Sequence, residues 1–254
     1  MTAISGYEGR IGRYTRELAE AMIGVAGVRP GQRALDVGCG GGALTEPLAQ
    51  LLGARQVVGV DPDEDAVEEC RARLPDVAVR VGSAEALPFA SGEFDVVLAQ
   101  LVMTLVTNAE RAAGEMRRVA RSGAVVATCV WDFAEGMTVL RTFWDAALAI
   151  APARAKERDQ ATYPYGRPDE LEALWLATGL GEVACGALLV GADYRDFEDL
   201  WHPLVLPDGS PGRFYATLDA RRQAALRDEV WQRLGRPEGG FRLSARAWYV
   251  TGHA

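Results

Sequence analysis

The chain has 254 residues and a formal net charge of -8, from 27 Lys and Arg against 35 Asp and Glu. Because proteins that bind nucleic acid usually present a basic face, this balance argues against a nucleic-acid partner. No apolar run reaches the roughly 20 residues of a membrane-spanning helix, and residues 1–16 lack the apolar stretch of a secretory signal. We therefore expect a cytoplasmic protein that binds neither nucleic acid nor membrane.

Cysteine spacing argues against both a metal site and a disulfide framework. No two cysteines form a C-x-x-C pair, and none lies near His202 or His253 in the sequence. We therefore expect no metal, and four reduced and mostly buried cysteines, namely Cys39, Cys70, Cys129 and Cys185.

Helical and strand patterns alternate through the first half of the chain. The periodicity predicts, in order, a helix over 10–28, a strand over 33–37, a helix over 45–52, a strand over 56–60, a helix over 63–73, strands over 77–81 and 94–99, a helix over 109–120 and a strand over 123–130. The strands are near-continuous apolar runs joined by short loops. Such a pattern is typical of a doubly wound α/β fold, in which helices cover both faces of a parallel sheet.

After residue 130 the alternation stops. We expect a helix over 137–150, an amphipathic helix over 169–178, a strand over 183–190, a proline-broken helical stretch over 193–240 and a final strand over 241–251. The chain is accordingly predicted to be a single structural domain. Residues 1–130 form its ligand-binding core, and residues 131–254 complete the sheet and add a helical lid over one rim, from about 131–168 and 193–240.

The sharpest local signal is a cluster of glycines over residues 38–42, between a predicted strand and helix. Glycines allow the backbone to turn tightly and to approach a ligand closely, and in open parallel sheets ligands bind beyond the carboxyl ends of the strands. Gly38, Gly40 and Ala43 also satisfy the dinucleotide pattern G-x-G-x-x-A, so an NAD site is one interpretation.

Two features favour a cationic ligand over a pyrophosphate. Asp36 places a carboxylate two residues before the first glycine, where it would repel an anion and attract an ammonium or sulfonium group. The following helix opens with Glu46 and Pro47, which add a negative charge and remove a backbone donor at the end that a pyrophosphate would use.

Two further strand ends carry polar groups that fit a nucleoside. Asp61 follows the second strand, where a carboxylate can accept hydrogen bonds from both ribose hydroxyls; it can equally cap the helix over 63–73. Ser83, Ala84 and Glu85 follow the third strand, where a hydroxyl and backbone amides could meet a purine or could form an ordinary turn.

Together these motifs resemble a class I S-adenosylmethionine-dependent methyltransferase of the bacterial small-molecule group. The motifs that carry the resemblance are residues 34–42, 58–61, 82–89, 94–97 and 117–119. The resemblance implies a Rossmann-like sheet of seven strands, mostly parallel with the last strand antiparallel. It also implies S-adenosylmethionine as cofactor, S-adenosylhomocysteine as product, and a methyl acceptor.

The resemblance also implies which residues bind the cofactor. Asp36 would accept from the amino group of the methionine part, Asp61 would hold the ribose, Ser83 and Ala84 would lie by the adenine, and Arg13 would meet the carboxylate. Relatives often carry Asp where this chain has Ser83, which weakens the expected acceptor for the adenine amino group. The full implied set is Arg13, Tyr14, Asp36, Gly38, Cys39, Gly40, Asp61, Pro62, Ser83, Ala84, Glu85 and Gln100.

The site of the methyl acceptor requires no fixed sequence motif, because methyl transfer depends on the alignment of donor and acceptor more than on a catalytic triad. The candidates are Trp131 and Asp132 after the fifth strand, and Tyr163 and His202 in the lid stretches. Asp132 could be a base or an ordinary loop carboxylate, and His202 a base or a surface histidine. We expect a small-molecule acceptor and a monomer or homodimer. The alternatives are a non-catalytic cofactor-binding protein and an NAD-dependent oxidoreductase.

Overall fold

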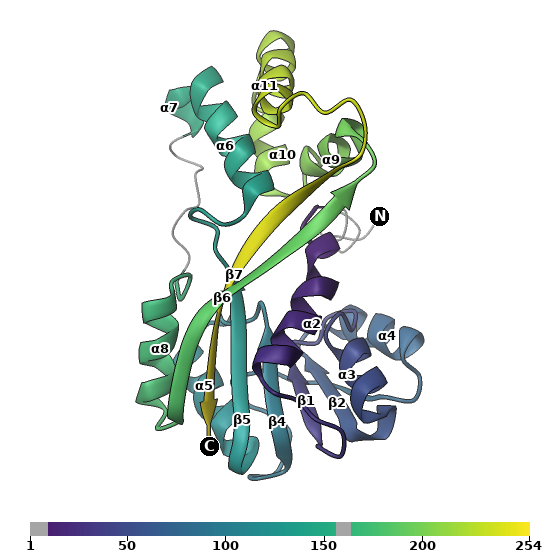
Figure 1. Cartoon of the computed structure of the whole chain (residues 1–254), viewed down its shortest axis with the longest axis vertical. Coiled ribbons are helices and arrows are strands. Elements are labelled where there is room, and N and C mark those ends of the chain that lie inside the picture. Colours follow the sequence, from purple (N-terminus) through teal and green to yellow (C-terminus); the bar gives the residue numbers. More distant parts are fainter. Residues whose placement is uncertain (1–9, 156–163) are drawn as a thin grey trace. The chain divides into compact units, whose positions relative to one another are not determined.

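The computed structural model describes residues 10–155 and 164–254 (Figure 1). The chain forms two compact units. The sheet unit comprises Arg16–Trp131, Pro164–Leu188 and Ala247–Ala254, and the helical unit comprises Met1–Thr15, Asp132–Tyr163 and Leu189–Arg246. The predicted division into a core over residues 1–130 and a remainder over 131–254 stays a prediction.

Seven strands form one sheet in the order β3-β2-β1-β4-β5-β7-β6. Strands β1, β2, β3, β4 and β5 pair in parallel, and β7 runs antiparallel to β5. This confirms the predicted doubly wound sheet with an antiparallel last strand. The strands are β1 (Ala34–Val37), β2 (Val57–Asp61), β3 (Ala78–Val81), β4 (Phe94–Gln100), β5 (Ala120–Trp131), β6 (Gly181–Tyr194) and β7 (Phe241–His253).

Helices cover both faces of the sheet because side chains alternate along each buried strand. On one face, α5 (Ala109–Val119) and α8 (Pro168–Ala177) belong to the same apolar core as Leu35 and Val37 of β1. The indole of Trp175 donates to the Val126 carbonyl oxygen at 3.1 Å. On the other face, Met22 of α2 (Thr15–Val25) contacts Cys129 of β5, with their sulfurs 3.6 Å apart.

The two remaining helices of the sheet unit lie beside the glycine cluster. They are α3 (Thr45–Leu52), which matches its predicted bounds, and α4 (Glu64–Arg73). Asp63 caps α4, since its side chain accepts from the Asp65 amide at 3.0 Å; such caps are typically worth about 1 kcal/mol. Each helix follows a strand that ends at the same edge of the sheet, α3 after β1 and the glycine turn, and α4 after β2.

Aromatic side chains build the core of the helical unit. The ring of Phe143 lies 6.4 Å from that of Trp201 and 6.2 Å from that of Phe214, and Phe197 stacks on Trp201 at 5.8 Å. The unit contains the short turn η1 (Gly12–Tyr14) and the helices α6 (Thr138–Ile150), α7 (Pro152–Ala155), α9 (Phe197–Leu204), α10 (Ser210–Tyr215) and α11 (Ala220–Arg233).

Strands β6 and β7 extend beyond their predicted ends, and both run through the two units. The unit boundary divides β6 between Leu188 and Leu189, and β7 between Arg246 and Ala247. The part of β6 after residue 190 carries Gly191 and Asp193, whose composition favours a loop. It is a strand because its buried residues Ala192 and Tyr194 pack in the helical unit.

Within the part of the chain that the structure describes, no helix combines the length and the apolar character needed to cross a bilayer.

Candidate functional site

The carboxyl ends of β1, β2, β3 and β4 meet at one edge of the sheet unit. Because these strands are parallel neighbours, the segments that follow them must emerge side by side. The edge therefore brings together the glycine cluster after β1, Asp61 at the end of β2, the turn at Ser83 after β3, and Gln100 at the end of β4. This grouping is the one predicted from the order of the motifs.

Gly38 and Gly40, in the turn after β1, have different surroundings. The amides of Gly38 and Cys39 donate to the Val60 carbonyl oxygen at 2.7 and 3.1 Å, which ties the turn to β2. Gly38 has φ +72°, and a Cβ there would lie 2.4 Å from a methyl of Val102. Gly40 has φ +50°, but a Cβ there would meet no described atom within 4 Å. Gly38 is thus required for packing, whereas Gly40 faces open space.

Asp36 is a buried carboxylate of which only one oxygen has a hydrogen-bond partner among the described residues. Its side chain is 1% exposed, and its Oδ2 accepts a 2.6 Å hydrogen bond from the Thr45 hydroxyl. Among the described residues, its Oδ1 has no hydrogen-bond partner. Burial raises the pKa of Asp36 to about 7, and the hydrogen bond from Thr45 opposes that rise. A buried acceptor without a partner fits a ligand that brings a donor, above all a cationic one.

Asp61 links the two strand ends to α4. Its Oδ2 accepts from the Gly40 amide at 2.9 Å, and its Oδ1 accepts from the Asp63 amide at 2.9 Å. Pro62 lies exposed between these two contacts. Since each carboxylate oxygen has a second lone pair, Asp61 can still accept from two hydroxyl groups. A vicinal diol of a ribose fits this arrangement.

Cys39 contributes to the turn through its backbone. Its thiol is buried and points toward β2, where a Cβ on Gly59 would lie 3.0 Å from the sulfur. A hydrogen bond to Cys70 of α4, together with burial, raises the pKa of the Cys39 thiol. The side chain therefore packs beneath the turn, and the Cys39 carbonyl oxygen accepts from the Gly42 amide at 2.9 Å.

The turn after β3 is held largely by its own contacts. The Ser83 hydroxyl oxygen accepts from the Glu85 amide at 3.1 Å, and the Ala84 side chain belongs to the apolar core. The Glu85 carboxylate accepts from the amides of Thr107 and Asn108 at 2.8 and 3.0 Å. Glu85 thus joins this turn to the start of α5, while Ser83 remains exposed.

Gln100 and Trp131 end the next two strands along the edge. Gln100 is the last residue of β4 and pairs with Cys129 of β5. Trp131 is the last residue of β5, pairs with Ala247 of β7 and is only 3% exposed. Both side chains therefore sit on rigid strands rather than on loops.

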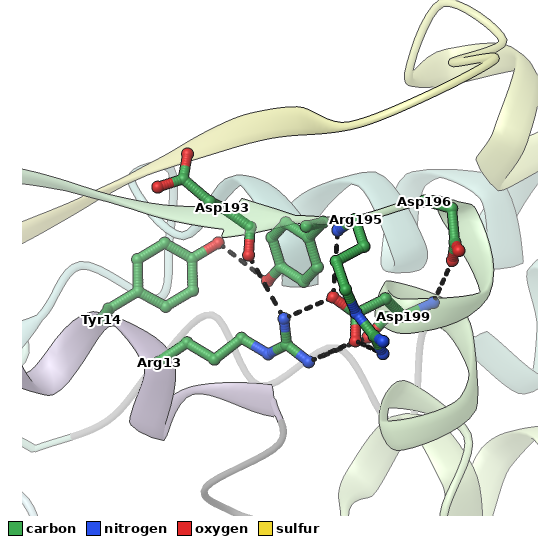
Figure 2. A network of polar contacts seen from close by, with 7 residues as sticks. Arg13, Tyr14, Asp193, Arg195, Asp196 and Asp199 are labelled. Atoms are coloured by element: carbon green, nitrogen blue, oxygen red, sulfur yellow. Dashed lines mark hydrogen bonds and ion pairs between the residues drawn. The ribbon is translucent and has the colours of Figure 1, made fainter.

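Arg13 and Tyr14 belong to the helical unit, where a polar network holds both side chains (Figure 2). The Arg13 guanidinium donates to both carboxylate oxygens of Asp199, at 2.9 and 3.0 Å, and lies over the ring of Tyr194. Hydrogen bonds from Arg13 and Arg195 hold the pKa of Asp199 well below its ordinary range. The hydroxyls of Tyr14 and Tyr194 are 3.1 Å apart and buried. In the described structure, Arg13 is thus engaged by an acidic residue of its own unit.

Asp132 is held by an arginine. Its side chain is buried, and its Oδ2 accepts from Arg246 Nε at 2.8 Å and from Nη2 at 2.5 Å. Its Oδ1 accepts from the Glu135 amide at 3.1 Å. Both carboxylate oxygens of Asp132 are thus engaged within its own unit, so this geometry favours the structural alternative for Asp132.

The other two acceptor-side candidates are placed differently. His202 is exposed on α9, with its Nε2 3.3 Å from a carboxylate oxygen of Glu198, one helical turn earlier. Tyr163 lies outside the described residues.

Comparison with known proteins agrees with the Rossmann-like fold of the seven-stranded sheet. Residues 35–128 match the family model described as a methyltransferase domain. The ubiquinone biosynthesis O-methyltransferase of Rhizobium rhizogenes is 34% identical over 181 residues, which span 68% of this chain and 67% of that protein.

Two solved structures share the fold. A protein of Anaeromyxobacter dehalogenans, named only provisionally as a type II methyltransferase, superposes with a TM-score of 0.65 at 23% identity and covers 94% of this chain and 96% of its own. A phosphoethanolamine N-methyltransferase of Haemonchus contortus, solved with S-adenosylhomocysteine, has a TM-score of 0.57 at 16% identity and covers 93% of this chain and 52% of its own. The chain belongs to the class I S-adenosylmethionine-dependent methyltransferases.

Three residues that organise these contacts were not singled out by the sequence motifs, namely Thr45, Asp199 and Arg246. Thr45 lies nine positions after Asp36 at the start of α3, so its proximity to the glycine turn was a usable signal. Asp199 and Arg246 lie 186 and 114 positions from their partners, and no local pattern points to them.

Proposed function

We propose that this methyltransferase transfers the methyl group of S-adenosylmethionine to a small-molecule acceptor. The observation that carries the cofactor assignment is the buried Oδ1 of Asp36 beside the glycine turn, which has no hydrogen-bond partner within residues 10–155 and 164–254. It suits the ammonium of the methionine part, whereas it would repel the pyrophosphate of a dinucleotide. NAD therefore remains the weaker alternative.

The residues at the edge of the sheet divide into three recognition groups. Asp36 and the open space before Gly40 would receive the methionine part, Asp61 would receive the ribose hydroxyls, and Ser83 and Ala84 would lie by the adenine. The fit is best for the first two groups. Ser83 offers an exposed hydroxyl oxygen that already accepts from the Glu85 amide, so we expect a modest adenine contribution to affinity.

S-adenosylmethionine, when bound, supplies a methyl group on a sulfonium that leaves as a neutral thioether. The chain's own task is then to hold the donor rigidly and exclude water, which is why no described nucleophile–base pair is required. Because Asp132 is bound by Arg246, we do not assign it as a base. An acceptor that must lose a proton would need another group, for which His202 stays a candidate.

A small acceptor is supported by the net charge of -8, which disfavours a polyanion. It is also supported by the relatives, since the Rhizobium protein is named for ubiquinone biosynthesis and the Haemonchus protein for phosphoethanolamine. One of these is an O-methyltransferase and the other an N-methyltransferase, so the acceptor atom is left to the experiment.

The decisive experiment is calorimetric titration of the purified protein with S-adenosylmethionine, S-adenosylhomocysteine and NAD, followed by an acceptor screen with methyl-labelled cofactor. We expect micromolar binding of the first two compounds and none of NAD. Binding of NAD alone would overturn the proposal. Tight binding of S-adenosylmethionine without turnover on phenolic, amine or carboxylate acceptors would favour the non-catalytic alternative.

The substitution Asp61→Ala is expected to lower affinity for S-adenosylhomocysteine by about 30-fold or more. It removes the acceptor for the ribose hydroxyls and the contact that ties the Gly40 amide to β2, each worth about 1 kcal/mol or more to a charged acceptor. Isothermal titration gives the affinity, and circular dichroism checks the fold.

The control for Asp61 is Asp63→Ala, two residues away. Asp63 is exposed and caps α4, so its loss is expected to destabilise the protein by about 1 kcal/mol while leaving cofactor affinity unchanged. Equal affinity losses in both variants would show that the effect of Asp61 is one of helix capping, and the ribose assignment would fail.

A further inference from the structure

The hydroxyl of Thr45 makes a buried contact that helix formation does not explain. Thr45 is the first residue of α3 and is fully buried. Its hydroxyl donates across the glycine turn to Asp36 Oδ2 at 2.6 Å. The side chain therefore serves the carboxylate on the neighbouring strand rather than a free amide of its own helix.

This contact makes the two oxygens of Asp36 unequal. Oδ2 is held by Thr45, whereas Oδ1 is buried and has no hydrogen-bond partner among the described residues. Because a hydroxyl donor on one oxygen restricts rotation of the carboxylate, it also fixes the direction in which the other oxygen points. The result is a single buried acceptor in a defined orientation beside the glycine turn.

We propose that Thr45 is the positioning residue of the ammonium subsite: its hydroxyl orients Asp36 so that Oδ1 receives the amino group of the cofactor. The proposal rests on the proposed function, since it assumes a ligand with an amino-acid part. Thr45 itself touches no reacting atom.

The charges around Asp36 make this contribution necessary. Asp36 lies between β2 and β4 in the sheet and faces the turn and α3. The other titratable groups that act on it or feel its charge are the Asp61 carboxylate and the thiols of Cys39 and Cys70. None of these is a cation. Burial and Asp61 raise the pKa of Asp36, and hydrogen bonds from the side chain and backbone of Thr45 are what lower it.

The test compares wild type with Thr45→Val, which removes the hydroxyl at similar volume, and Thr45→Ser, which keeps it. Affinities are measured from pH 6 to pH 9 for S-adenosylhomocysteine and for 5′-methylthioadenosine, which lacks the amino-acid part. At pH 7 we expect Thr45→Val to bind S-adenosylhomocysteine about tenfold or more weakly. The pH at which its affinity is half-maximal should also rise, because the ionised carboxylate has lost a donor.

The controls separate positioning from general packing. Thr45→Ser should bind S-adenosylhomocysteine nearly as wild type does, and 5′-methylthioadenosine should bind all variants equally. Equal losses for both ligands in Thr45→Val, or an unchanged pH profile, would overturn the proposal. If Thr45→Val fails to fold, Thr45→Ala removes the same hydroxyl without a methyl against the carboxylate and is judged by the same criteria. Failure of wild type to bind S-adenosylhomocysteine would instead contradict the proposed function.

Discussion

Asp36→Asn is expected to abolish measurable cofactor binding at micromolar concentrations while making the ligand-free protein more stable at pH 8. The amide keeps the shape of the side chain and a contact to Thr45, but it cannot neutralise a buried ammonium. Loss of a buried charge-assisted contact typically weakens binding by about 100-fold or more.

The gain in stability follows from the direction of the pKa shift. Burial raises the pKa of Asp36 from 3.8 to about 7 in the folded chain, so the folded state holds its proton more tightly than the unfolded state. The stability that the neutral carboxyl contributes is fully present below about pH 4 and is lost as the pH rises to about 7. Above that pH the buried charge costs up to about 4 kcal/mol, which asparagine avoids.

Urea unfolding of both proteins at pH 5 and pH 8, with and without S-adenosylhomocysteine, checks this prediction. The variant should exceed wild type in free energy of unfolding at pH 8, and the difference should shrink at pH 5. The ligand should stabilise wild type only. A variant that binds within a few-fold of wild type, or that is less stable at pH 8, would remove Asp36 from the ammonium subsite.

Gly40→Val is expected to abolish cofactor binding and to leave the fold intact. A side chain at Gly40 would enter space in which it meets no described atom within 4 Å, and that space is where we place the methionine part. The positive φ of +50° adds strain of about 1–2 kcal/mol for a residue with a Cβ. Calorimetric titration reports binding, and circular dichroism with thermal unfolding reports the fold.

Two matched variants separate occlusion of the site from backbone strain. Gly53→Val also places a Cβ at a glycine of positive φ with open surroundings, and its φ of +88° with ψ 139° makes the strain at least as large as at Gly40. Gly53 ends α3, so this variant should lose stability and leave binding unchanged. Gly38→Val should lose stability by several kcal/mol, because its side chain would collide with Val102. If Gly53→Val weakens binding as much as Gly40→Val, strain alone explains the effect and the space before Gly40 is not the ligand site.

Much of the sheet unit was predictable because its signals are local. Apolar runs of strand length, separated by amphipathic helices, indicated a parallel sheet, and the helix over 45–52 was predicted to the residue. The glycine turn and Asp61 fell at strand ends in the sequence, and parallel strands necessarily bring such ends to one edge. The family resemblance followed from those same local motifs.

Only the tertiary structure decided which partners the candidate side chains contact. Arg13 reads locally as a free cation suited to a carboxylate ligand, yet Asp199, 186 positions later, accepts from it at two oxygens. Asp132 reads as a possible base, yet Arg246 neutralises it. A charged side chain forms an ion pair with an opposite charge that the folded backbone brings within about 4 Å, and the separation of two residues in the sequence does not predict that distance.

The sequence by itself therefore determined the class of enzyme, the sheet and the edge at which the proposed cofactor residues gather, since each depends on periodicity and short motifs. Tertiary structure alone decided which polar atoms stay available to a ligand. In the folded chain, one carboxylate oxygen of Asp36 accepts from Thr45 and the other has no partner among the described residues. The sequence does not reveal this, because burial and hydrogen bonding are properties of the packed chain.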